Sequence, residues 1–269
     1  MIKQSIKLWL SLLPIIYDFM ALSKNKIKYI QSLKDKKHRL EYGTFVAEGE
    51  KLVFDLLQSC RCQFIAVLPE VLSKFSNFKD VEIIIASEEE LKRASFLKTS
   101  SSVIGVFYQP GSNFSAGDLK NDVHLVLDGI QDPGNLGTIV RIADWFGIEH
   151  VFCSRDTVDI YLPKTVQSTM GALSRVKVHY VDLDVFFKST LDLPVYGTFL
   201  DGENIYEAKF SVNGFIVMGN EGSGIRPSVE KWVNRRLFIP NYPALRSTSE
   251  SLNVAAATAI VCSEFRRRQ

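Results

Sequence analysis

The residue types best suited to chemistry lie in three separated segments, 125–141, 215–224 and 239–254. In each of them an apolar run leads into polar residues or glycines, and in the first the run is followed by Asn135 and Arg141. Ligands of α/β proteins bind where strands end and loops open into helices. The layout therefore predicts a site rather than a packed core.

The helix expected after Asn135 has two different faces. Its apolar stripe has helical spacing and should face the core; it consists of Ile139, Ile142, Ala143 and Phe146. Arg141 lies on another face, and a cation near a helix start gains nothing from the helix dipole, so we expect Arg141 to meet an anion. Asn135 has two interpretations, a helix cap and a site residue.

The second segment is a glycine-rich loop after a strand. Its glycines, Gly219, Gly222 and Gly224, allow backbone groups to approach a ligand closely. Their order is not that of a dinucleotide-binding fingerprint. Glu221 is either a solvated loop acid or part of the site.

The third segment opens an alanine-rich helix with Ser251 and Asn253. Ser249 or Ser251 can cap that helix. The alanines at 255–257 permit close backbone approach, as a threaded helix or a dimer interface would require.

In this order the three segments resemble motifs 1, 2 and 3 of the SpoU (TrmH-type) family of RNA ribose 2'-O-methyltransferases, within the knotted SPOUT superfamily. The resemblance spans roughly the last half of the chain, and it implies S-adenosylmethionine as cofactor and a homodimer formed through the C-terminal domain. The matching catalytic positions are Asn135, Arg141, Glu221, Ser251 and Asn253. The positions that would cradle the cofactor are Thr198, Gly219, Ile239, Leu252 and Ser251.

The family reaction moves a methyl group to a ribose 2'-oxygen, which must be aligned behind the methyl group and lose its proton. Arg141 would hold an RNA phosphate with two hydrogen bonds and so fix the nucleotide. Since a guanidinium stays protonated in proteins, positioning is better supported for Arg141 than proton removal. Glu221 would orient the site, and no metal is expected.

The N-terminal half is predicted to form a small α/β domain. Strands are expected at 45–47, 63–68, 81–85 and 103–108, with helices near 50–58 and 88–97. Residues 39–49 resemble the start of the substrate-binding domain that precedes many SpoU methyltransferases, a module similar in fold to ribosomal protein L30e. The basic cluster beside it supplies the candidate RNA contacts Lys34, Lys36, Lys37 and Arg39, with a solvated helix face as the alternative.

The predicted fold class is α/β with two domains. An L30e-like RNA-binding domain at 23–110 is followed by a linker at 111–119 and a SPOUT methyltransferase domain at 120–269. In the second domain, strands at 123–128, 150–153, 195–200, 215–218 and 236–239 alternate with helices, which predicts a buried, mostly parallel sheet. The trefoil knot is implied by the resemblance alone.

Composition sets broad limits. The 269 residues carry a net charge of +2, so charge alone does not indicate a nucleic-acid-binding protein. The four scattered cysteines lack zinc spacing and suggest reduced thiols in a cytoplasmic protein. Residues 1–22 are expected to be an extension, either a non-native start or disordered, and their apolar stretch is too short to span a membrane.

Two other functions compete with this prediction. One is a catalytically inactive RNA-binding protein of the same fold, suggested by the loop 241–250, which is longer than usual and lacks the expected glycine. The other is a nucleotide-dependent α/β enzyme for small metabolites, disfavoured because no phosphate-binding fingerprint follows the first strand. The patterns do not encode the target, ribosomal or transfer RNA, nor its nucleotide.

Overall fold

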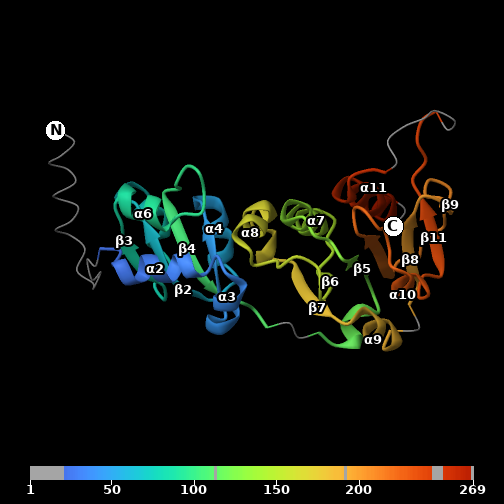
Figure 1. Ribbon diagram of the computed structural model, residues 1–269, viewed down its shortest axis with the longest axis horizontal. Coiled ribbons are helices and arrows are strands. Elements are labelled where there is room, and N and C mark those ends of the chain that lie inside the picture. The colour runs from blue at the N-terminus through green and yellow to red at the C-terminus, as the bar shows by residue number, and fades with distance from the viewer. Residues whose placement is uncertain (1–20, 112–113, 191–192, 244–250, 268–269) are drawn as a thin grey trace.

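The computed structural model describes residues 21–111, 114–190, 193–243 and 251–267. Two sheets divide these residues into an N-terminal unit, from residue 21 to 108, and a C-terminal unit, from residue 114 onwards (Figure 1). Most of the predicted extension lies outside the described residues, but Leu22 is buried in the N-terminal core.

The N-terminal unit is a four-stranded sheet with the order β1-β4-β2-β3, in which β2 and β3 are parallel and the other pairs antiparallel. Apolar side chains on alternate positions of the strands pack on helices at both faces of the sheet. Its strands are β1 (Thr44–Glu48), β2 (Cys62–Val67), β3 (Glu82–Ile85) and β4 (Val103–Tyr108). Its helices are α2 (Lys24–Ser32), α3 (Lys36–Tyr42), α4 (Glu50–Leu57), α5 (Leu72–Phe75) and α6 (Glu88–Ala94).

The C-terminal unit contains seven parallel strands in the order β7-β6-β5-β10-β8-β11-β9, which confirms the prediction of a parallel sheet. Its strands are β5 (Val123–Asp128), β6 (His150–Ser154), β7 (Lys177–Val181), β8 (Val195–Phe199), β9 (Glu203–Asn204), β10 (Gly214–Gly219) and β11 (Arg235–Phe238). The sequence patterns missed β7 and β9. Both are edge strands with partly exposed residues, so they lack the continuous apolar run of a buried parallel strand.

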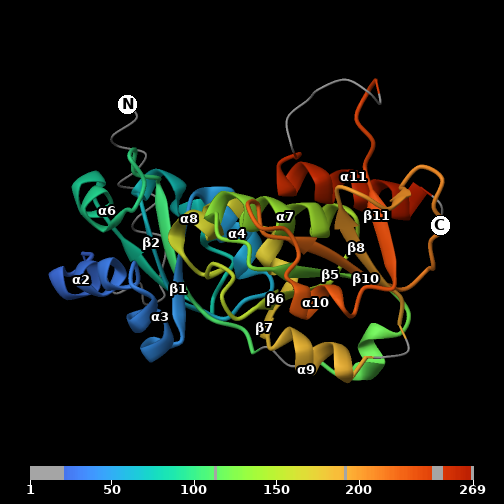
Figure 2. The same ribbon diagram turned by 45° about the vertical axis from the view of Figure 1, so that its right-hand side comes forward.

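Helices cover both faces of this sheet (Figure 2). On one face lie α7 (Pro133–Trp145), α8 (Pro163–Thr169) and α11 (Val254–Arg267), and on the other α9 (Leu183–Lys188) and α10 (Pro227–Glu230). The predicted stripe of α7 faces the core, with Ile139 and Ala143 fully buried. Gly137 allows α7 to touch α8, since a Cβ added there would lie 2.4 Å from the Cβ of Ser168.

Part of the predicted linker packs against the C-terminal unit. The Phe114 ring lies edge-on to Phe152 with a centroid distance of 5.0 Å. Leu119 is fully buried in the same apolar cluster. The second half of the linker is therefore ordered by burial of its apolar residues.

A buried ion pair joins the two units. The Arg39 guanidinium, on α3, donates to the Asp159 carboxylate over 2.7 and 3.1 Å, and it also donates to the carbonyl oxygens of Leu33 and Lys34. The Arg39 side chain is only 2% exposed. Beside it the rings of Phe45 and Tyr161 meet at a centroid distance of 4.9 Å. The junction thus combines apolar packing with a charge pair whose hydrogen bonds are satisfied.

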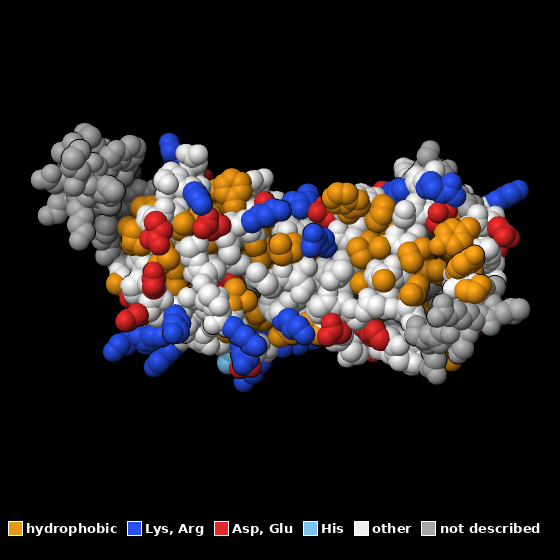
Figure 3. All heavy atoms as spheres, turned by 90° about the horizontal axis from the view of Figure 1, so that it is seen from above, with side chains coloured by type: hydrophobic (Ala, Val, Ile, Leu, Met, Phe, Trp, Pro, Cys, Tyr) orange, Lys and Arg blue, Asp and Glu red, His pale blue; other side chains and the backbone are white. Residues whose placement is uncertain are grey.

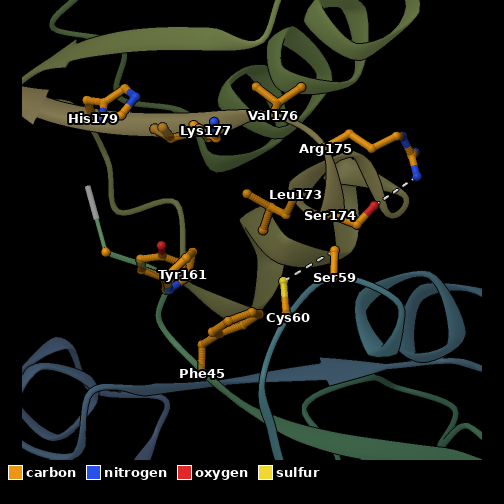
Figure 4. A pocket seen from close by; sticks show the side chains of 13 residues that line it. Phe45, Ser59, Cys60, Tyr161, Leu173, Ser174, Arg175, Val176, Lys177 and His179 are labelled. Carbon is orange, nitrogen blue, oxygen red and sulfur yellow. Dashed lines mark hydrogen bonds between the residues drawn. The ribbon is translucent and has the colours of Figure 1, made fainter. Parts of the chain in front are cut away.

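A cavity of about 160 Å³ lies at the same junction (Figure 4). Phe45 and Cys60 line it from the N-terminal unit, and Tyr161, Leu173 and Val176 line it from the C-terminal unit. Burial raises the pKa of the Cys60 thiol and of the Tyr161 hydroxyl, so both groups are neutral at pH 7. None of the residues that line this cavity belongs to the three segments singled out in the sequence.

The buried His124, on β5, makes stability sensitive to acid. Burial lowers the pKa of His124 and the nearby His150 lowers it further, whereas a hydrogen bond to the Leu119 carbonyl and the charges of Asp122 and Glu149 oppose the shift. Because the folded pKa lies below the unfolded value of about 6.5, folding favours the neutral ring, and stability should fall as the pH drops below that value.

We expect His124→Phe to weaken the pH dependence of the free energy of unfolding. A phenyl ring can keep the packing against Phe152 and Phe215 but cannot bind a proton. Urea unfolding at several pH values between about 7 and 5 would measure how the free energy of unfolding changes with pH. A variant whose free energy of unfolding falls as steeply as that of the wild type would contradict this assignment.

No helix among the described residues is both long and apolar enough to cross a membrane. The four cysteines form no disulfide. Burial raises the pKa of the Cys62 thiol to about 12, and Cys153 is completely buried, so neither is a reactive thiolate at pH 7.

Candidate functional site

The three sequence segments meet at the carboxyl edge of the parallel sheet. Strands β5 and β10 are neighbours, and Asp128 pairs with Gly219 at their ends. The loop into α7 and the glycine-rich loop after β10 therefore start side by side. The start of α11 reaches the same place through Asn253, whose amide contacts Asn135.

A chain of hydrogen bonds links one residue from each segment. The Asn135 Nδ2 group donates to Glu221 Oε1 over 2.8 Å, and the Asn253 Nδ2 group donates to Asn135 Oδ1 over 3.0 Å. Both ends of the Asn135 amide are therefore engaged, and its orientation is fixed by its neighbours. This Glu221–Asn135–Asn253 chain unites three of the five predicted catalytic positions.

Asn135 does not cap its helix. The helix begins at Pro133, and the cap is Asp132, whose Oδ1 accepts the Asn135 backbone N–H over 2.8 Å. Asn135 thus lies within the first turn, and its side chain is left for Glu221 and Asn253. The capping interpretation was wrong because the acid that precedes Pro133 is the better-placed cap.

Asn253 performs the capping expected of a serine in the third segment. Its Oδ1 accepts the backbone N–H groups of Ala255 and Ala256 over 3.0 and 3.3 Å. Ser251 is exposed and makes no hydrogen bond within the described part of the chain, and Ser249 lies outside it. One amide side chain therefore both starts α11 and ties it to Asn135.

The glycine-rich loop owes its shape to Asn220. The Asn220 Nδ2 group donates to the Gly129 carbonyl over 2.7 Å, while its Oδ1 accepts the N–H groups of Gly222 and Ser223. A Cβ added to Gly219 would lie 2.3 Å from the Gly224 carbonyl carbon, so this position excludes any side chain. Glu221 is left exposed at the tip of the loop, facing Asn135.

Sequence reasoning missed a second polar group beneath this loop. Asp128 is fully buried, and it accepts the Arg226 Nε–H and backbone N–H, each over 2.8 Å. Arg226 also donates to Asp156 over 3.1 Å. These contacts tie the loop after β10 to the ends of β5 and β6. An acid that directly ends an apolar strand was the available signal.

Arg141 stands apart from the hydrogen-bonded chain. It lies on the outer face of α7 and is exposed. Within the described residues its guanidinium makes no hydrogen bond or ion pair, so its five N–H donors are available to a ligand. The side chain adds nothing to the packing of α7, as the sequence predicted.

The predicted cofactor positions follow three adjacent strands, β10, β8 and β11. Gly219 ends β10, Thr198 lies next to the end of β8, and Ile239 follows β11. The Thr198 hydroxyl already donates to the Val217 carbonyl over 3.3 Å, so this residue would meet a ligand through its backbone.

Leu252 joins this edge from the start of α11 and is 51% exposed. Exposed apolar side chains beside strand ends suit an adenosyl group, which takes apolar contacts on its faces and backbone hydrogen bonds at its edge. Most of the loop 241–250 lies outside the described residues, so its predicted effect on the cofactor stays a prediction.

The predicted RNA contacts divide into two kinds. Lys34, Lys36 and Lys37 are exposed and form no ion pair among the described residues. Figure 3 shows Lys and Arg side chains gathered along one edge of the N-terminal unit. Arg39 does not fit the prediction of an RNA contact. Its side chain is buried and bound to Asp159, so it cannot reach a phosphate. A charge pattern in sequence cannot distinguish an arginine of the core from one at the surface.

Comparison with protein families agrees with the fold. Residues 122–263 match the SpoU rRNA Methylase family, and residues 24–105 match the MRM3-like substrate binding domain. The chain therefore belongs to the SpoU rRNA methylase family, and the resemblance seen in the three segments is confirmed.

Three similar proteins match along nearly their whole length. The chain is 29% identical to the 23S rRNA (guanosine(2553)-2'-O)-methyltransferase RlmP of Bacillus subtilis, over 90% of this chain and 96% of that protein. A TrmH-family structure from Porphyromonas gingivalis is 40% identical, with a TM-score of 0.84 over 92% of this chain and 99% of the other. An AdoMet-bound rRNA methyltransferase from Sinorhizobium meliloti is 26% identical, with a TM-score of 0.81 over 91% and 95% of the two chains.

Proposed function

We propose that this protein is an RNA ribose 2'-O-methyltransferase that uses S-adenosylmethionine and acts on ribosomal RNA. The observation that carries the proposal is the Glu221–Asn135–Asn253 chain, which joins the three family segments at one edge of the sheet. The relatives named for ribosomal RNA favour that substrate over transfer RNA. The inactive RNA-binding alternative has no observation in its favour among the described residues, which include all five predicted catalytic positions.

The chain's own residues have separable roles in this reaction. The free Arg141 guanidinium binds a phosphate of the target nucleotide with two hydrogen bonds and so positions its ribose. Asn135 and Asn253 hold the Glu221 carboxylate at the tip of its loop, next to the start of α7. Because these groups are already ordered, little reorganisation is needed when the ribose arrives.

The cofactor belongs at the ends of β8, β10 and β11. Backbone groups near Thr198, Gly219, Ile239, Ser251 and Leu252 would hold its adenosyl portion. When bound, S-adenosylmethionine supplies a methyl group on a positively charged sulfur. Asp128 and Arg226 support this edge from below by fixing the loop that follows Gly219.

Further properties belong to the same proposal. A homodimer through the C-terminal domain follows from the family resemblance, and Trp145, 84% exposed on the face of α7 that carries Arg141, is of the residue type enriched in protein interfaces. The trefoil knot belongs to the same proposal and rests on the family resemblance alone. We further propose a cytoplasmic location, a domain boundary within 111–119 and RNA recognition by the N-terminal unit.

Transfer of labelled methyl groups from S-adenosylmethionine to purified ribosomal RNA tests the function. A ribose 2'-O-methyl group blocks alkaline cleavage of the adjacent phosphodiester bond, because the 2'-oxygen can no longer attack the phosphorus. We expect the label in alkali-resistant dinucleotides. Label in mononucleotides would instead indicate base methylation, and no transfer would contradict the proposal.

The three exposed lysines give a prediction about RNA affinity. Replacing Lys34, Lys36 and Lys37 with Gln should lower the slope of log Kd against log salt by up to about two units, since each contact with single-stranded RNA contributes about 0.7. A matched control replaces the exposed Lys79, Lys92 and Lys98 of the same unit. Equal slopes in wild type and variant would show that the cluster is only a solvated face.

A further inference from the structure

The N-terminal unit carries a group of aromatic rings at its surface, in which Tyr42 is exposed and Tyr29 packs on the core. Tyr42, the last residue of α3, is 45% exposed. Its ring meets Tyr29 edge-on at 5.2 Å and lies nearly parallel to the His38 ring at 6.2 Å, with 16° between the planes. We call Tyr29, His38, Tyr42 and Tyr108 the aromatic cluster.

Hydrogen bonds hold the cluster in place. The Tyr29 hydroxyl bonds to Thr44 Oγ1 and donates to Gln63 Oε1, each over 2.9 Å, so it spans β1 and β2. His38 Nδ1 lies 3.2 Å from the Ser32 carbonyl oxygen. The exposed Tyr42 ring therefore rests on two anchored rings, and it would lose little conformational freedom when another flat group stacks on it.

One cation contacts a ring of this cluster, and others lie nearby in the chain. The exposed Arg61 guanidinium lies 4.5 Å above the ring centre of Tyr108, which pairs with Thr44 across the sheet. Lys36 and Lys37 lie one turn or more before Tyr42 on α3, with Lys34 just ahead of that helix. Two acids, Asp35 and Glu41, are also near, but the exposed cations outnumber them.

We propose that the aromatic cluster is a stacking platform for a single-stranded segment of the RNA substrate. A base would stack on Tyr42, while Lys36, Lys37 and Arg61 would bind the neighbouring phosphates. Aromatic rings beside basic side chains are the chemistry by which proteins hold single strands without reading sequence. A duplex would offer phosphates but no free base faces. The inference rests on the proposed function, because it places the RNA of that reaction on the N-terminal unit.

The test measures affinity of the full chain for a labelled single-stranded RNA of about a dozen nucleotides and for a duplex of the same length. Tyr42→Ala should weaken single-strand binding about fivefold to a hundredfold, the effect of losing one stacked base. Tyr42→Phe keeps the ring and should bind within about twofold of wild type. Leu40→Ala, which removes an apolar side chain of the same helix that is 65% exposed, is the matched control.

Duplex affinity and S-adenosylmethionine binding should stay unchanged in all three variants, and thermal unfolding checks that each is folded. An unchanged single-strand affinity in Tyr42→Ala, or an equal loss for the duplex, would overturn the platform. If Tyr42→Ala instead lost a protein partner in pull-downs while keeping RNA affinity, the surface would be a protein-docking site and the proposal would be wrong.

The proposed methyltransferase function and the stacking platform can be refuted separately. Wild-type protein that binds single strands through Tyr42 but transfers no methyl group would refute the function and leave the platform. Wild-type protein that methylates RNA while Tyr42→Ala keeps full affinity would refute only the platform.

Discussion

Arg141→Ala should lower the single-turnover rate of methyl transfer to RNA by about 100- to 1000-fold. Within the described residues the Arg141 guanidinium has no partner, and the side chain lies off the buried stripe of α7. The loss should therefore fall on positioning of the nucleotide and leave the fold intact. Calorimetric titration with S-adenosylmethionine should give a Kd within about twofold of wild type, because the cofactor edge lies on other strands.

Two variants sharpen this result. Arg141→Lys keeps the charge but loses the fork that grips a phosphate with two hydrogen bonds, so it should recover only part of the rate. Arg93→Ala, which removes an exposed arginine from α6, should keep the wild-type rate. A rate for Arg141→Ala close to that of wild type would remove Arg141 from the mechanism.

Arg39→Met should lower the free energy of unfolding by about 3–5 kcal/mol, the cost of leaving one partner of a buried ion pair without the other. Arg39 is 2% exposed and its partner Asp159 is 16% exposed, so water cannot replace the lost contact. The measurement is urea unfolding followed by circular dichroism. An exposed pair gives the comparison: Lys177→Met removes the partner of Glu149 and should cost less than about 1 kcal/mol.

The double variant Arg39→Met/Asp159→Asn separates the pair from its surroundings. Removing both charges should recover part of the loss, since no uncompensated charge remains at the junction. If Arg39→Met costs no more than Lys177→Met, Arg39 is not a structural residue, and its original interpretation as an RNA contact returns.

Much of the fold was predictable because buried strands have a strong sequence signal. All nine predicted strands are present, and those at 103–108 and 123–128 have the predicted bounds. The missed strands β7 and β9 lie at the edges of their sheet, where partly exposed side chains break the apolar run. Edge strands depend on pairing with a neighbour, which a single segment of sequence does not reveal.

The residues of the site could be predicted from the sequence, but the hydrogen bonds between them could not. The motifs predicted that Asn135, Glu221 and Asn253 belong to one site, whereas the Asp132 cap of α7 and the bond from Arg226 back to Asp128 were missed. Arg39 shows the same limit, because its partner lies 120 residues away in the chain. Long-range pairs of this kind depend on how separate elements pack, which local patterns do not record.

The most direct test of the account is a map of 2'-O-methylated riboses in ribosomal RNA from cells with and without this gene. We expect one ribose position to lose its methylation in cells without the gene. The wild-type gene should restore that methylation, and the Arg141→Ala variant should not. Identical maps in both strains would contradict the claim that this protein is a ribosomal RNA 2'-O-methyltransferase.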